Sequence, residues 1–109
     1  MAYDEGTAEI LRNDLADEAR VEEKRMFGGL CFMLEGHMLC GVHDGGGMFR
    51  VGKDREAQAL AIDGVSEMAF TGRKMGGLVD VTDAVMEDDE RRGQLMDLAR
   101  ENVRSLPPR

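Results

Sequence analysis

The sequence predicts an α+β fold with an antiparallel sheet. Apolar residues recur at helical spacing near both ends of the chain, and short apolar runs bounded by glycine turns fill the middle. The resulting order is α-β-β-β-α-β-β-α, or α-β3-α-β2-α, which favours an α+β fold with an antiparallel sheet. With 109 residues, the chain is expected to form one domain over residues 1–109.

The first half of the chain is expected to hold one helix and three strands. Residues 4–20 predict an amphipathic helix, because apolar residues are spaced three and four positions apart among acidic ones. Strands are predicted over residues 25–34 and 37–43, joined by a two-residue turn at Glu35-Gly36. Glycine at the second position supplies the positive φ that such a turn needs. A third strand is predicted over residues 47–51.

The next segment is expected to hold a helix and two strands. Residues 54–62 predict a helix whose first turn is capped by the side chain of Asp54. Short strands are predicted over residues 67–70 and 78–81, on either side of a loop with the sequence TGRKMGG.

A final helix is predicted after the acidic run at residues 87–90. Acidic residues near its start and Arg100 and Arg104 near its end suit the helix dipole. Pro107 and Pro108 end it. The acidic run itself is interpreted as a solvated helix entrance and not as an acid–base pair.

Composition and charge narrow the function classes. The chain has 22 acidic against 14 basic residues and a net charge of −8, so we do not expect direct binding to nucleic acid. The acidic start does not resemble a signal peptide, and no apolar run is long enough to span a bilayer. We therefore expect a cytoplasmic protein that does not bind membranes and whose two cysteines are reduced.

The predicted hairpin sorts its side chains between two faces. A tight turn at Glu35-Gly36 would place Cys31 opposite Cys40 and Met33 opposite Met38, and successive side chains would alternate between faces. One face would then carry Phe27, Cys31, Met33, Met38, Cys40 and Val42. The other would carry Leu30, Phe32, Leu34, His37, Leu39 and His43.

This sorting bears on the two thiols. Cys31, His37, Cys40 and His43 together suggest a zinc ligand set, but here the thiols and the imidazoles lie on opposite faces, so no metal site is expected. A disulfide between Cys31 and Cys40 is geometrically feasible in this register. We expect free thiols because the compartment is reducing and the nearest charges are acidic. A thiol redox switch at the pair remains an alternative.

Both faces of the hairpin are apolar, so both need to be covered. The terminal helices, a second copy of the chain or another protein are the candidates. We expect a homodimer or another protein to cover the second face. The candidate interaction face consists of Phe27, Met33, Met38 and Val42.

No arrangement of nucleophile and base is visible, so we expect a non-enzymatic protein without a cofactor. The serines lack the context of a nucleophile elbow. The loop TGRKMGG is the remaining candidate site, because its glycines free backbone N–H groups and its two cations could attract an anion. The residues concerned are Thr71, Gly72, Arg73, Lys74, Gly76 and Gly77. A small anionic-ligand sensor is therefore a second alternative, with no ligand identified.

Several motifs resemble the N-terminal domain of the TfoX/Sxy family. RMFGGLCFMLEGHMLCGV, FRVGKD, TGRKMGG and RSLPPR carry the resemblance over nearly the whole chain, and MAYDEG is similar to the start of short, stand-alone members. The resemblance implies a two-layer fold of the secretion-chaperone-like type. It also implies a link to regulation of natural competence, in which longer relatives with a second domain act alongside the cyclic-AMP receptor protein. It implies no catalytic residues. The chain differs from the family in having Lys74 where proline is usual.

Overall fold

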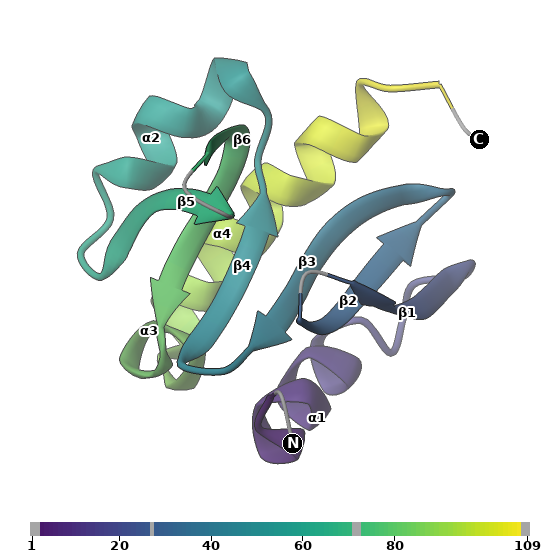
Figure 1. Ribbon diagram of the computed structural model, residues 1–109. Helices are drawn as coiled ribbons and strands as arrows, with labels where there is room; N and C mark the ends of the chain where they lie inside the picture. The colour runs from purple at the N-terminus through teal and green to yellow at the C-terminus, as the bar shows by residue number, and fades with distance from the viewer. Residues whose placement is uncertain (1–2, 27, 71–72, 108–109) are drawn as a thin grey trace.

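The computed structural model describes residues 3–26, 28–70 and 73–107. Within these residues, six strands form one antiparallel sheet in the order β1-β2-β3-β4-β6-β5, and the helices pack on one of its faces (Figure 1). In chain order the elements are α1 (Glu5–Asp14), β1 (Val21–Met26), β2 (Gly29–Leu34), β3 (His37–His43), β4 (Gly46–Arg50), the 3-10 helix η1 (Lys53–Arg55), α2 (Glu56–Leu60), β5 (Val65–Phe70), β6 (Arg73–Thr82), α3 (Asp83–Glu87) and α4 (Asp89–Arg104). The predicted α+β class with an antiparallel sheet is confirmed.

The first strand differs from the prediction. Residues 25–34 were expected to form one strand, but Met26 pairs with Gly29, so the chain reverses there and β1 becomes an additional edge strand. The segment Val21–Met26 is mostly charged and exposed, as edge strands often are because charge discourages pairing with other chains. The predicted strand pattern missed β1 because its apolar content is low.

The helices are also shorter than predicted in the first half. α1 ends at Asp14 and not at residue 20, and Asp54 caps no helix because η1 already begins at Lys53. α4 agrees with the prediction more closely. The carboxylate of Asp88 accepts hydrogen bonds from the backbone N–H groups of Glu90 and Arg91, which makes the acidic run the N-terminal cap of α4.

The turn at Glu35-Gly36 is confirmed, but the register beyond it is not the predicted one. Both turn residues have positive φ, and Leu34 pairs with His37. Met33 then pairs with Met38, whereas Phe32 pairs with Cys40, so Leu39 is an extra residue in β3. This is a β-bulge, in which two residues of one strand oppose one of the other. The prediction that Cys31 lies opposite Cys40 is therefore wrong.

The bulge separates two apolar clusters. Leu39 and Cys40 both belong to the core between sheet and helices, although they are consecutive residues. This helix-side core contains side chains from all four α-helices, including Leu11, Ala59, Val85 and Leu95. A smaller cluster lies on the opposite face of the sheet, which we call the outer face. It contains Cys31, Met38, Met48, Met68 and Leu78, with Met26 and Met33 packed against it.

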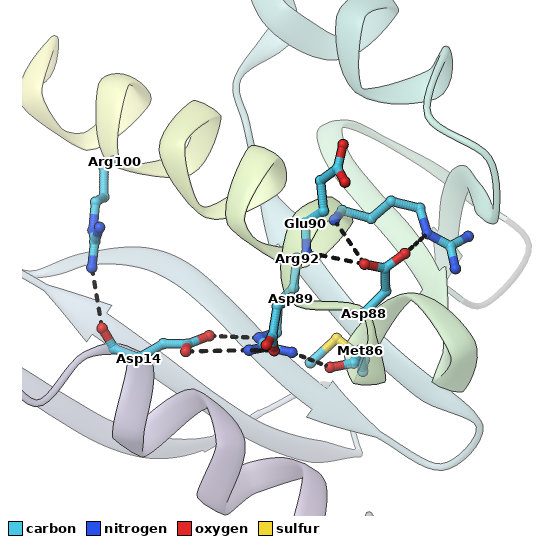
Figure 2. Close-up of polar contacts among 8 residues, drawn as sticks. Asp14, Met86, Asp88, Asp89, Glu90, Arg92 and Arg100 are labelled. Atoms are coloured by element: carbon cyan, nitrogen blue, oxygen red, sulfur yellow. Dashed lines mark hydrogen bonds and ion pairs between the residues drawn. The ribbon is translucent and has the colours of Figure 1, made fainter.

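An arginine holds the helix layer together. The guanidinium of Arg92 on α4 is buried, and its Nε–H donates to the carboxylate of Asp14 at the end of α1 over 2.6 Å (Figure 2). Its Nη1–H donates to the carbonyl oxygen of Met86 over 2.7 Å, and its Nη2–H to the carboxylate of Asp89. This fork connects α1, α3 and α4 by charge-assisted hydrogen bonds.

Replacing Arg92 with methionine is expected to lower the free energy of unfolding by about 2 kcal/mol, since a buried carbonyl and a partly buried carboxylate lose a charged donor. The matched control is its neighbour Arg91, whose ion pair with Asp88 is more exposed. Arg91→Met is expected to lower the free energy by less than about 1 kcal/mol. Urea denaturation of both variants measures the difference. Equal losses would contradict the role of Arg92.

Candidate functional site

The outer face of the sheet is the candidate site. Its apolar cluster is built mainly from methionine, and most of its members are buried without any helix above them: Cys31 and Met48 are 0% exposed and Met38 is 5% exposed. The Met48 methyl group lies over Gly41, where a Cβ atom would come within 2.9 Å of it. Long, flexible thioether chains thus cover the face by folding over it. The remaining apolar surface is concentrated in one place.

That place is a groove where β3 and β4 separate. The two strands pair from His43 and Gly46 to Cys40 and Phe49, and β3 continues on to Met38 and His37 without β4 beside it. The divergence of β3 and β4 is visible in Figure 1. Residues from both strands line a groove of about 530 Å³ there. We call it the methionine groove, because Met26, Met33 and Met38 line it together with Leu106 from the end of the chain.

The charged groups lining the groove are all basic. Lys24 on β1 and Arg50 at the end of β4 are its charged residues, and no Asp or Glu is among the described residues that line it. Both cations are exposed, and in the described part of the chain neither makes an ion pair. In a chain with a net charge of −8, the groove is therefore a locally positive site.

A second hollow continues from the groove. It has a volume of about 340 Å³, shares Arg50 and Leu106 with the methionine groove, and adds Lys53 and Arg55. Arg55 is paired with Glu101 over 3.6 Å, whereas Lys53 lies along Gly76 of β6. Asp54 also lines this hollow, so it carries charges of both signs, unlike the methionine groove.

The end of the chain closes one side of the groove. The Nε2–H group of His37 donates to the carbonyl oxygen of Pro107 over 2.6 Å, because a carbonyl can only accept. This contact holds the segment after α4 beside the turn between β2 and β3. Leu106 is 37% exposed and lines the groove as a result.

The structure brings together only part of the predicted interaction face. Met33 and Met38 pair across β2 and β3 and both line the methionine groove. Val42 does not share their face: it is fully buried in the helix-side core, because the bulge changes the alternation. Phe27 lies outside the described residues. Lys24 and Arg50 were not among the predicted site residues. The one feature of the sequence that pointed to them is that each is a cation within or next to a predicted strand in an acidic chain.

The two thiols face opposite sides of the sheet. Cys31 lies in the outer cluster and Cys40 in the helix-side core, and both are free and buried. Burial raises the pKa of the Cys31 thiol to about 11, and burial also raises the pKa of Cys40. Thiols with raised pKa values are poor nucleophiles at neutral pH. A disulfide between them would require the strand pair to be rebuilt.

The histidines are not sorted as predicted either. His43 lies on the outer face with Cys31, yet both of its ring nitrogens are occupied: Nδ1–H donates to the carbonyl of Asp44, and Nε2–H to the carboxylate of Asp80 over 2.6 Å. Both contacts are made by a donor, so they favour the doubly protonated ring. In that form the ring has no lone pair with which to take a proton from Cys31. Within residues 3–26, 28–70 and 73–107, no three His, Cys, Asp or Glu side chains gather as metal ligands would.

The last five residues of the segment TGRKMGG form a strand and not a loop. Residues 73–77 are part of β6, and the backbone N–H of Gly77 donates to the carboxylate of Glu56 over 3.1 Å. The Gly77 carbonyl accepts from Val51 and Gly52. One of the backbone donors expected to bind an external anion is thus already bound to a carboxylate of the chain. Thr71, Gly72 and the side chains of Arg73 and Lys74 lie outside the described part of the chain, and Gly76 is exposed.

Both thiols are expected to resist alkylation in the folded protein and to react only after unfolding. Mass spectrometry after maleimide treatment, with and without urea, measures this. Mild oxidation before the treatment is expected to leave both thiols available. The loss of two hydrogen atoms from the mass of the monomer would instead show an intramolecular disulfide and would revive the redox switch.

The ion pair of His43 is expected to make stability depend on pH. Burial lowers the pKa of His43, but hydrogen bonds from the ring to Asp44 and Asp80 outweigh this effect, so the folded-state pKa is raised. A raised pKa contributes stability that is fully present below the unfolded value of about 6.5 and is lost as the pH rises through the folded value. The difference in unfolding free energy between the wild type and His43→Gln should therefore shrink from pH 6 to pH 9. A difference that stays constant or grows would contradict this account.

One comparison with known proteins agrees with the motifs of the sequence. A family model described as the TfoX N-terminal domain matches residues 13–103, which include every strand and α4 except for its last residue. No curated protein and no solved structure matches the chain. Among the described residues, no helix has the length and apolar character needed to cross a membrane. The chain belongs to the TfoX N-terminal domain family.

Proposed function

We propose that this chain is a non-catalytic regulatory module that acts in the cytoplasm by binding another protein through the outer face of its sheet. The observation that carries the proposal is the methionine groove, where apolar side chains are accessible between two cations that form no ion pair with any described residue. Membership of the TfoX N-terminal domain family supports a link to the regulation of natural competence.

The chemistry of the nucleophilic residues supports a non-catalytic role. Cys31 and Cys40 are buried with raised pKa values, and the ring of His43 is engaged at both nitrogens. A nucleophile needs an adjacent base with a free lone pair, and His43 offers none. The same burial argues against the thiol redox switch, and the bond from Gly77 to Glu56 weakens the case for the anion sensor.

A different protein fits the outer face better than a second copy does. A two-fold homodimer places the same surface on both sides of the interface. Around the methionine groove it would bring Lys24 and Arg50 of both copies close together, which opposes association. A homodimer through this face remains the alternative, and it predicts a doubled mass in size-exclusion chromatography with light scattering.

Photo-crosslinking in living cells tests the proposal. With a photo-reactive amino acid in place of Met33, we expect a covalent adduct with another protein, because this side chain lines the groove and is partly exposed. The matched control carries the same amino acid in place of Gln94, an exposed residue of α4 on the opposite side of the protein, and is expected to give none. No adduct at Met33, or equal adducts at both positions, would refute the proposal.

The link to competence has its own readout. Deleting the gene for the chain is expected to change transcript levels of DNA-uptake genes. The wild-type chain and Gln94→Glu should restore them, and Met33→Glu should not. Unchanged transcripts after the deletion would remove the competence link and leave the binding proposal to the crosslinking result.

A further inference from the structure

We propose that the methionine groove binds a short acidic segment of the partner protein, in which an apolar side chain lies between two carboxylates. This inference rests on the proposed function and specifies the chemistry of the partner. It commits to a peptide segment of another protein as the occupant of the groove. Three features of the groove support this occupant: its apolar lining, its charge and the spacing of its cations.

The lining of the groove suits one or two apolar side chains. Met26 and Met33 are partly exposed there, and Met38 lies behind them at 5% exposure. Unbranched thioethers adjust to the shape of an incoming side chain, which is why methionine is frequent in peptide-binding surfaces. A volume of about 530 Å³ lies within the range of ligand-sized sites, although it is too small for a whole folded domain.

The charge of the lining selects an acidic partner. Several arginines elsewhere are paired with carboxylates of the chain: Arg12 contacts Glu5, Glu9 and Glu23, and Arg92 contacts Asp14. Lys24, Arg50 and the adjoining Lys53 make no ion pair within the described residues. Exposed arginines such as Arg25 are also unpaired there, so what distinguishes Lys24 and Arg50 is their position beside accessible apolar side chains. These cations are available to carboxylates from outside the chain.

The positions of the two cations set the spacing of the motif. Lys24 lies on β1 and Arg50 on β4, with β2 and β3 between them. Lys24 is level with Met48 of β4, three strand spacings of about 4.8 Å away, and Arg50 lies two residues beyond Met48 where β4 has left β3, so the backbones of the two cations are more than about 14 Å apart. An extended peptide advances about 3.3 Å per residue, so carboxylates four positions apart span about 13 Å, and the long side chains of Lys24 and Arg50 can reach inward to both. The residue midway between them points the same way and meets the methionines. The expected motif is acidic-x-apolar-x-acidic.

Other occupants fit less well. Single-stranded nucleic acid is usually bound by aromatic side chains on which bases stack, and no Phe, Tyr or Trp is among the described residues that line the groove; His37 is its one aromatic ring there and is bound to Pro107. A second copy of the chain would bring like charges together, as argued above. A long-chain fatty acid would use only one carboxylate and would leave either Lys24 or Arg50 without a partner.

The experiment selects peptides from a random 12-residue display library on the full chain and measures the binding of enriched peptides by fluorescence polarisation. Enriched sequences are expected to be acidic and to contain the five-residue motif. Lys24→Glu combined with Arg50→Glu should weaken their binding at least tenfold. Arg25→Glu combined with Arg104→Glu is the matched control and should change it by less than twofold. Arg25 is the exposed neighbour of Lys24 on β1 but lies outside the groove, as does Arg104.

A second variant tests the apolar anchor without changing charge. Met33→Ser should also weaken binding at least tenfold, and circular dichroism checks that each variant is folded. Binding should fall as salt rises, because the cations are exposed. Decanoate and a thymidine oligonucleotide serve as competitors and are expected to displace the peptide only weakly.

Several results would overturn the inference: no enrichment of binders, enriched peptides without acidic character, or equal binding by the double variant and its control. Strong displacement by decanoate or by the oligonucleotide would assign the groove to a lipid or to a nucleic acid instead. A chain that dimerises through Met33 would assign it to a second copy. If the photo-crosslinked partner contacts the groove through a neutral or basic segment, this inference fails while the proposed function stands. If no adduct forms at Met33, the proposed function fails as well.

Discussion

The bulge at Leu39 is the structural constraint on which the arrangement of both faces depends. Because β3 contains one more residue than β2 between the pairs Met33–Met38 and Phe32–Cys40, Leu39 and Cys40 both turn toward the helices. Cys31 and Met38 remain on the outer face with Met48. One inserted residue thus separates the thiols and assigns aliphatic side chains to the helix-side core. It leaves methionines on the face without helices.

This separation explains how a sheet can be apolar on two sides. The helix-side core buries rigid side chains such as Phe32, Phe49 and Leu95, which pack at high density. The outer face lacks a covering layer, and flexible methionine side chains cover it instead. Where β3 and β4 part, this cover is incomplete and the groove opens beside Lys24 and Arg50. The fold therefore creates both the apolar contact surface and its positive rim at the same point.

Much of the fold was predictable because local signals decided it. Gly36 fixed the hairpin turn, and the apolar spacing after residue 94 defined α4 with its cap at Asp88. Two features were not predictable from the sequence. β1 is charged and so lacks the apolar alternation of a half-buried strand. The bulge leaves no signal in the sequence. Leu39 and Cys40 are both apolar, so the bulged and the unbulged pairing of β2 with β3 would bury apolar side chains equally well.

The candidate site was predictable only for those of its residues that are close together in the sequence. Met33 and Met38 are close in the sequence and flank a tight turn, so their pairing followed from local geometry. Lys24, Arg50 and Leu106 come from distant parts of the chain and meet only because of the strand order and the contact between His37 and Pro107. Val42 was misplaced because strict alternation was assumed across the bulge.

The most direct test of this account is the set of cross-strand nuclear Overhauser effects between β2 and β3, since they report which residues oppose each other. The account predicts contacts between Phe32 and Cys40 and between Cys31 and Gly41, together with a contact from the Met48 methyl group to Gly41. Contacts between Cys31 and Cys40 and between Phe32 and Leu39 would instead show an unbulged hairpin. In that case the division of side chains between the two faces, and the groove that depends on it, would be wrong.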